Sequence, residues 1–125
     1  MDCTAMIVVR DVEASSRWYQ KLLGLTSAHG GAEFEMLMGD GRLQLMLHRR
    51  EAIEHPAITD PGEGNPGRGV LLYFSASSVD AVFERATEMG ADLIDEPHEN
   101  PNARAVEFSL RDPDGYALSV SEWRG

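Results

Sequence analysis

The same order of predicted elements occurs twice along the chain, and this repeat constrains the fold more than any other feature of the sequence. Each half begins with a short apolar strand, continues with an amphipathic helix that ends at a glycine, and finishes with three further strands. The two helix-ending glycines, Gly24 and Gly90, lie 66 residues apart. A repeat at this scale predicts two similar modules that share one core, because neither module easily buries its sheet alone.

In the first module, a β-branched apolar strand precedes Asp11, which is positioned to cap a helix that begins at Val12 and ends at Gly24. A Gly-Asp-Gly turn at 39–41 predicts a hairpin. The strand after this turn alternates strictly, with Leu43, Leu45 and Leu47 on one face and Gln44, Met46 and His48 on the other. The strands of this module are predicted at residues 5–10, 25–29, 34–38 and 42–48.

The second module repeats this order from residue 70 onwards. Ser77 and Asp80 have the spacing of a capping box, which predicts the start of a helix, and Gly90 ends that helix. A turn at 112–115, with the sequence Asp-Pro-Asp-Gly, introduces a last strand whose side chains alternate. The strands of this module are predicted at residues 70–75, 92–95, 105–110 and 116–122.

The chain has 125 residues, of which 42% are hydrophobic, and this size fits one domain at 1–125. We divide the domain into module one at 1–48, a linker at 49–69 that is rich in proline and glycine, and module two at 70–125. The predicted fold class is α+β, built from paired βαβββ modules. The helices are expected to cover one sheet face and to leave the other face curved around a cup.

Charge and hydropathy exclude several classes of function. The formal net charge of −10, from 21 acidic and 11 basic residues, argues against binding to nucleic acid or to an anionic membrane surface. No apolar run approaches the length of a membrane span, and charges at positions 2, 10 and 11 interrupt the region where a signal peptide has its apolar stretch. The single Cys3 cannot form a disulfide within the chain. We therefore predict a soluble, cytoplasmic protein.

Three segments of the sequence are similar to one known family. The stretches VVRDVEASSRWYQKLLGL, SSVDAVFERATEMGA and EFSLRDPDGYALSVSEW resemble the vicinal oxygen chelate superfamily. This superfamily includes glyoxalase I, extradiol dioxygenases, fosfomycin-resistance enzymes and the bleomycin-resistance type of drug-binding protein. The resemblance covers nearly the whole chain apart from the linker, and it implies the fold of paired βαβββ modules.

The resemblance also implies where a metal would be held. The enzymes of the superfamily bind a divalent metal with one ligand from each of four strands, usually His, Gln or Glu. The corresponding positions in this sequence are Thr4, Gln44, Leu71 and Ser119. Only Gln44 has a side chain of a ligand type, and a neutral amide alone does not hold zinc, nickel or iron. The pattern therefore implies no metal and no other cofactor, as in the metal-free bleomycin-resistance type.

Few other residues indicate catalysis, and no catalytic residue is assigned. The four histidines lack the spacings of metal motifs, and His48 is interpreted as a strand-end residue with a solvated ring in preference to a proton-transfer group. Glu107 shares a strand face with Ser109, and a solvated or salt-bridged carboxylate is its default interpretation. The loop at 96–101 either closes over the cup or is an exposed turn.

The leading hypothesis is metal-independent binding of a small apolar or aromatic molecule, with sequestration of an antibiotic-like compound, and thus antibiotic resistance, as one form of it. Two alternatives remain open. The first is an enzyme of the same fold, a glyoxalase-type lyase or isomerase or a dioxygenase-like enzyme, with a displaced metal site or with acid–base chemistry at His48 or Glu107. The second is a structural dimer whose cup is filled by its own side chains.

The expected partners are a small-molecule ligand and a second copy of the chain in a symmetric homodimer. Methionine suits an adaptable ligand surface, and a tyrosine on the cup face could stack on a planar ligand. The expected ligand-binding residues are Met6, Val8, Gln44, Met46, His48, Leu71, Tyr73 and Ser119.

Overall fold

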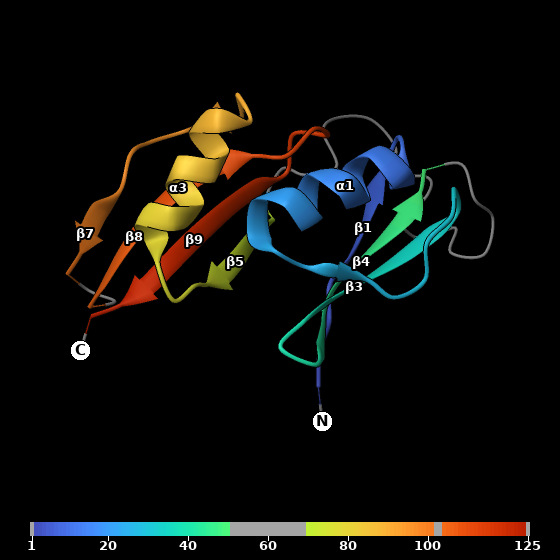
Figure 1. Cartoon of the computed structure of the whole chain (residues 1–125), viewed down its shortest axis with the longest axis horizontal. Helices are drawn as coiled ribbons and strands as arrows, with labels where there is room; N and C mark the ends of the chain where they lie inside the picture. Colours follow the sequence, from blue (N-terminus) through green and yellow to red (C-terminus); the bar gives the residue numbers. More distant parts are fainter. Residues whose placement is uncertain (1, 51–69, 102–103, 125) are drawn as a thin grey trace. The chain divides into compact units, whose positions relative to one another are not determined.

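The computed structural model describes residues 2–50, 70–101 and 104–124 (Figure 1). The chain divides into two compact units, residues 1–66 and 67–125, and each unit has its own mixed sheet and its own helix. The predicted α+β class with one helix per module is confirmed. Most of the predicted linker at 49–69 lies outside the described residues.

The first unit has the predicted order of one strand, one helix and three strands. Its sheet, which we call sheet A, has the strand order β1-β4-β3-β2. Strand β1 runs parallel to β4, and the other neighbours are antiparallel. The elements are β1 (Met6–Val9), α1 (Val12–Leu23), β2 (Thr26–Ser27), β3 (Phe34–Gly39) and β4 (Arg42–Arg49).

Helix α1 begins and ends where the sequence predicts. The Asp11 carboxylate accepts a hydrogen bond from the backbone N–H of Ala14 at 3.0 Å, which satisfies one of the free donors at the helix start. Gly24 adopts a left-handed φ of 70° and its N–H donates to the Gln20 carbonyl. Helix α1 packs against β3 and β4 (Figure 1). Its buried side chains include Tyr19 and Leu22.

The β3–β4 hairpin closes through a two-residue turn at Asp40 and Gly41, whose φ values of 53° and 72° are both positive. Two positive φ values are typical of a type I′ turn, whose twist matches that of the strands. The pairing then passes from Met38 with Leu43 to Leu37 with Leu45, so Gln44 has no register partner on β3. The prediction that β4 alternates strictly is therefore wrong at Gln44, because a bulge interrupts the strand there.

A buried carboxylate ties the helix of this unit to its sheet. Glu35 of β3 is 2% exposed, and its two oxygens accept five hydrogen bonds. The donors are the hydroxyls of Ser16 (2.7 Å) and Ser27 (2.8 Å) and the backbone N–H groups of His29 (3.2 Å), Gly30 (2.9 Å) and Met36 (2.9 Å). One side chain thus connects α1, β2 and the following loop to β3.

These hydrogen bonds also determine the charge state of Glu35. Burial alone raises the pKa of the carboxyl group, but the bonds that it accepts, above all from Ser16 and Gly30, outweigh burial. The pKa is lowered from 4.5 to about 2. The group is therefore ionised in the folded protein throughout the neutral and mildly acidic range.

The second unit repeats the order with one extra short strand. Its sheet, which we call sheet B, has the order β5-β9-β8-β6, with β7 also paired to β8 and β5 parallel to β9. The loop at 96–101 is therefore not merely an exposed turn, because it contains β7. The elements are β5 (Leu71–Ser75), α3 (Val79–Glu88), β6 (Asp92–Leu93), β7 (His98–Asn100), β8 (Ala105–Arg111) and β9 (Ala117–Trp123).

Helix α3 starts one residue later than predicted. Ser78, and not Ser77, is the N-cap, and its hydroxyl accepts from the backbone N–H of Ala81 at 3.2 Å. A second free donor, the N–H of Val79, is satisfied from outside the helix by the Glu122 carboxylate at 3.0 Å. The helix packs against β8 and β9 (Figure 1), where the rings of Phe83 and Phe108 meet edge to face, 5.2 Å apart.

One aspartate holds the turn that the sequence predicts before β9. The Asp112 side chain accepts from the backbone N–H groups of Asp114 at 2.8 Å and of Tyr116 at 2.9 Å. Gly115 has a φ of 91°, a conformation that glycine adopts without strain. The turn therefore sets the register in which β9 enters the centre of sheet B.

Neither helix of the described residues is long and apolar enough to cross a membrane.

We predict that Glu35→Gln destabilises the protein at neutral pH and that this cost shrinks in acid. Because the pKa of Glu35 is about 2 in the folded state against 4.5 ordinarily, its contribution is present above pH 4.5 and is lost as pH falls towards 2. The shift corresponds to about 3 kcal/mol. Urea unfolding of the wild type and the variant at pH 7 and pH 3 measures the cost of the substitution at each pH. Glu33→Gln is the control, because Glu33 pairs with Arg49 on the surface (3.0 Å) and should contribute at most about 1 kcal/mol. An equal cost of Glu35→Gln at both pH values would contradict the prediction.

We also predict that Leu45→Ala lowers the free energy of unfolding by about 2 to 5 kcal/mol, because Leu45 is buried and its truncation leaves a cavity. Met46→Ala, at the next position but partly exposed on the other face, is the control and should cost clearly less. Denaturant unfolding of the two variants gives the comparison. Equal losses would show that the two faces of β4 do not differ in packing as the structure indicates.

Candidate functional site

Sheet A has one face against α1 and one face that no helix of its unit covers. Glu35 bonds to Ser16 of α1, so its neighbours Phe34 and Met36 point to the uncovered face. The strand register extends this face in two rows across β1, β4 and β3. We call it the methionine face, formed by the row Met6, Met46 and Met36 and the row Val8, His48 and Phe34.

The two rows of the methionine face differ in exposure. The three methionines are partly exposed, whereas Val8 and His48 are buried. His48 is 4% exposed, its Nδ1 lies 3.0 Å from the Arg49 carbonyl oxygen, and its ring meets Phe34 at a centroid distance of 6.3 Å. The predicted solvated ring of His48 is therefore wrong. The accessible part of this face is apolar and consists mainly of flexible methionine side chains.

Gln44 does not extend these rows, because it lies at the bulge of β4. Its side chain is exposed, and its amide donates to the backbone carbonyl of Gly39 at 3.1 Å. The side chains of Leu25 and Gln44 lie close to the Gly39 backbone. A Cβ atom at Gly39 would lie 2.9 Å from the Leu25 side chain and 3.3 Å from that of Gln44. Gln44 therefore stabilises the end of the β3–β4 hairpin through this hydrogen bond.

Sheet B also has an uncovered face, opposite the one that packs on α3. The register places Leu71 beside Ala117 and Tyr73 beside Ser119 on this face. Leu71 is 55% exposed and Tyr73 is 51% exposed, whereas Ser119 is buried and its hydroxyl lies 2.7 Å from that of Ser109. Two of the three residues expected here are thus accessible, and the third is engaged in a hydroxyl pair.

Glu107 is the one carboxylate of β8 on this uncovered face. The register sets it opposite Ser121, and Ser109 opposite Ser119. One Glu107 oxygen accepts from the Tyr73 hydroxyl at 2.8 Å, and the other accepts from the Asn100 amide at 3.0 Å. The carboxylate is therefore held in place from β5 and from β7, by two neutral donors.

The expected ligand-binding residues left out Phe34, Met36 and Asn100, and the sequence did not predict the hydrogen-bond partners of Glu107. The register of the β3–β4 hairpin, set by the Asp-Gly turn, was the signal that could have added Phe34 and Met36 to Met46 and His48. No sequence signal pointed to Asn100, because β7 was not predicted. The eight expected residues lie on the two sheets: Met6, Val8, Gln44, Met46 and His48 on sheet A, and Leu71, Tyr73 and Ser119 on sheet B.

The side chains at the four positions implied for a metal do not fit one. Ser119 is engaged with Ser109, Gln44 donates to Gly39, Leu71 has no donor atom, and Thr4 offers a neutral hydroxyl. Zinc and the transition metals require about three nitrogen, sulfur or carboxylate ligands. Among residues 2–50, 70–101 and 104–124, no group of three His, Cys, Asp or Glu residues lies close enough to hold a metal ion.

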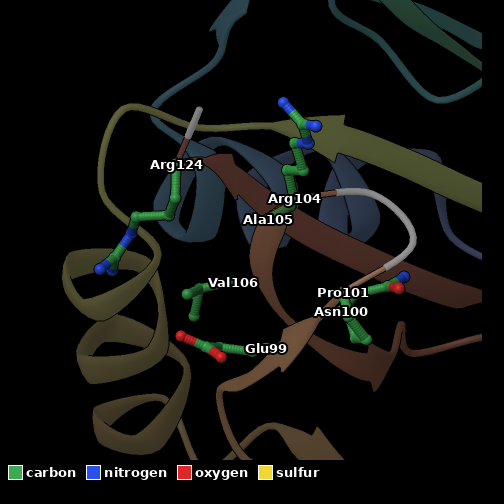
Figure 2. Close-up of a pocket in the computed structure, with 7 residues that line it drawn as sticks. All are labelled: Glu99, Asn100, Pro101, Arg104, Ala105, Val106 and Arg124. Carbon is green, nitrogen blue, oxygen red and sulfur yellow. The ribbon is translucent and has the colours of Figure 1, made fainter.

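A separate cavity of about 320 Å³ lies at one end of sheet B, where β7 and β8 pair (Figure 2). Its lining residues are Glu99, Asn100, Pro101, Arg104, Ala105, Val106 and Arg124. Figure 2 shows Arg104 and Arg124 directed away from each other, and Arg124 pairs with Glu122. Their charges therefore do not converge on one point, and none of the eight expected ligand-binding residues lines this cavity.

Many solved structures have a similar fold. A glyoxalase/bleomycin resistance protein/dioxygenase family enzyme from Burkholderia phytofirmans PsJN matches with a TM-score of 0.81 and 24% identity over 97% of each chain. A glyoxalase/bleomycin resistance protein/dioxygenase from Nocardioides matches at 0.74 and 26% identity, over 98% of this chain and 83% of that chain. TioX from Micromonospora sp. ML1 matches at 0.76 and 19% identity over 99% of each chain. No curated protein matches the sequence.

The sequence itself matches a family model along almost its whole length. The model is that of the Glyoxalase/Bleomycin resistance protein/Dioxygenase superfamily, and it matches residues 3–120. The match includes both βαβββ modules, and it confirms the resemblance to the vicinal oxygen chelate proteins. The chain therefore belongs to the glyoxalase/bleomycin resistance protein/dioxygenase superfamily.

Proposed function

We propose that the protein binds a small, mainly apolar or aromatic molecule without the help of a metal ion, on the sheet faces that its helices leave uncovered. The observation that carries this proposal is the row Met6, Met46 and Met36, which crosses three strands of sheet A and remains partly exposed. An exposed row of this kind costs free energy in water, and a ligand that covers it recovers that free energy.

The composition of both faces supports the same kind of ligand. Unbranched methionine side chains adapt to irregular apolar surfaces, and Phe34 beside them offers an aromatic ring. On sheet B, Leu71 and the ring of Tyr73 are about half exposed. Such sites commonly combine apolar area for affinity with a few polar groups for orientation. Sequestration of an antibiotic-like compound is one function that a surface of this chemistry would serve.

The donor chemistry supports binding without a metal. Thr4, Gln44, Leu71 and Ser119 supply no carboxylate, imidazole or thiolate where the enzymes of the superfamily hold their metal. The protein therefore has to recognise its ligand through side-chain contacts of its own.

We predict that Met46→Ala and Tyr73→Ala each weaken the binding of a neutral planar probe, naphthalen-2-ylmethanol, about five- to tenfold, because each removes apolar contact area. Isothermal titration in buffer with and without EDTA measures the affinity, which should not depend on the chelator. Met89→Ala is the matched control, because Met89 caps α3 and lies outside both faces. The proposal fails if the wild type does not bind the probe, or if EDTA abolishes binding. Unchanged affinity in both variants would leave the uncovered faces without a role.

We further propose that the protein is a symmetric homodimer, since pairing adds apolar burial to two small units whose sheets each have an uncovered face. Light scattering coupled to gel filtration should give twice the chain mass of 13.8 kDa at micromolar concentration. A mass of one chain under these conditions would contradict the prediction.

A further inference from the structure

The uncovered face of sheet B carries a carboxylate whose charge is not neutralised by a neighbour. Both oxygens of Glu107 accept hydrogen bonds, but the donors, Tyr73 and Asn100, are neutral. A carboxylate offers about four lone-pair directions, so two hydrogen bonds leave acceptor capacity. Among the described residues, no lysine or arginine forms an ion pair with Glu107.

His98 and Arg111, which the register places on the same face as Glu107, have other partners. His98 stands opposite Glu107 on β7, but its Nδ1 lies 2.8 Å from the Glu96 carbonyl oxygen and 3.9 Å from an Asp95 carboxylate oxygen. Arg111, four residues along β8, donates to the Gly115 carbonyl at 3.1 Å. Two hydrogen bonds thus hold the Glu107 carboxylate, and neither His98 nor Arg111 forms an ion pair with it.

Aromatic side chains flank this carboxylate. The Tyr73 hydroxyl touches it, and the Tyr73 ring is 51% exposed. Trp123 is 76% exposed and stands opposite Ala105, so on the same face it is the diagonal neighbour of Glu107, roughly 7 to 8 Å away along the sheet. Aromatic faces attract organic cations as well as apolar groups, and tryptophan does so most strongly.

We propose that Glu107, with Tyr73 and Trp123, forms a recognition site for the cationic group of a small organic amine or guanidine whose remaining part is apolar. The proposal rests on the proposed function and names the chemical class of its ligand. The ammonium group would donate to the free acceptor positions of Glu107, a charge-assisted bond, while the apolar part covers the exposed rings. The net charge of −10 further favours the approach of a cation.

Two probes of equal shape separate the charge from the apolar contact. Naphthalen-2-ylmethylamine is protonated at pH 7, and naphthalen-2-ylmethanol is its neutral counterpart. Isothermal titration at low salt should show at least tenfold tighter binding of the amine to the wild type. Glu107→Gln should remove this preference and leave the affinity for the alcohol within about twofold. Glu84→Gln, at an exposed position of α3, makes the same charge change away from this face and should retain the preference.

Two further variants test how the site is built. Tyr73→Phe keeps the ring but removes the hydroxyl that holds Glu107, so it should reduce the preference for the amine at least threefold. It also provides the test if Glu107→Gln does not fold, as judged by thermal melting. Trp123→Ala should weaken both probes, because it removes a shared aromatic surface.

The possible outcomes distinguish this inference from the function on which it rests. If the wild type binds both probes equally, or if Glu107→Gln or Tyr73→Phe retains the full preference, the cation site is wrong and the proposed function stands. If neither probe binds, the proposed function fails and this inference fails with it.

Discussion

Each sheet of this protein is packed by a single helix of its own unit, and this constraint explains both the core and the candidate site. A sheet with one helix has one face that must be mainly apolar, with any buried polar group hydrogen-bonded, and another face that is free to vary. Sheet A buries Leu37, Leu45 and Leu47 on the side of α1, and sheet B buries Phe108 and Leu118 on the side of α3. The uncovered faces therefore carry the side chains that packing does not dictate, and these are the residues in which function is expected.

Glu35 and Glu107 differ in the number of hydrogen-bond donors around their carboxylates. Glu35 faces a helix, accepts five hydrogen bonds and has a pKa of about 2, so all of its acceptor capacity serves to join elements of one unit. Glu107 faces away from a helix and accepts two bonds from neutral donors. Both are carboxylates in the middle of strands. The difference lies in the number of donors around them, which leaves Glu107 able to accept a further donor.

Local chemistry made most of the fold predictable. The Asp11 cap, the Gly24 stop, the Asp40-Gly41 turn and the Asp112 turn each depend on a few adjacent residues, and all were recognised from the sequence. Features that depend on distant partners were not. The bulge at Gln44 follows from pairing with β3, the cap at Ser78 coincides with a contact from Glu122 to the helix start, and the burial of His48 depends on packing over its ring. The positions of the candidate site were therefore predictable as strand faces, whereas exposure and hydrogen-bond partners were not.

A single substitution at one of the implied metal positions would not create a metal site. Ser119 is engaged in a buried hydroxyl pair with Ser109, so a larger carboxylate at that position would have to displace this pair and would stand on the same face as Glu107. Two carboxylates on one face repel each other unless a cation lies between them. Leu71 meanwhile contributes exposed apolar area where a metal ligand would be needed. Apolar contact and a carboxylate held by neutral donors form a consistent alternative on this sheet, because in the proposed site the exposed rings and Leu71 would supply affinity for a ligand and Glu107 would supply its orientation.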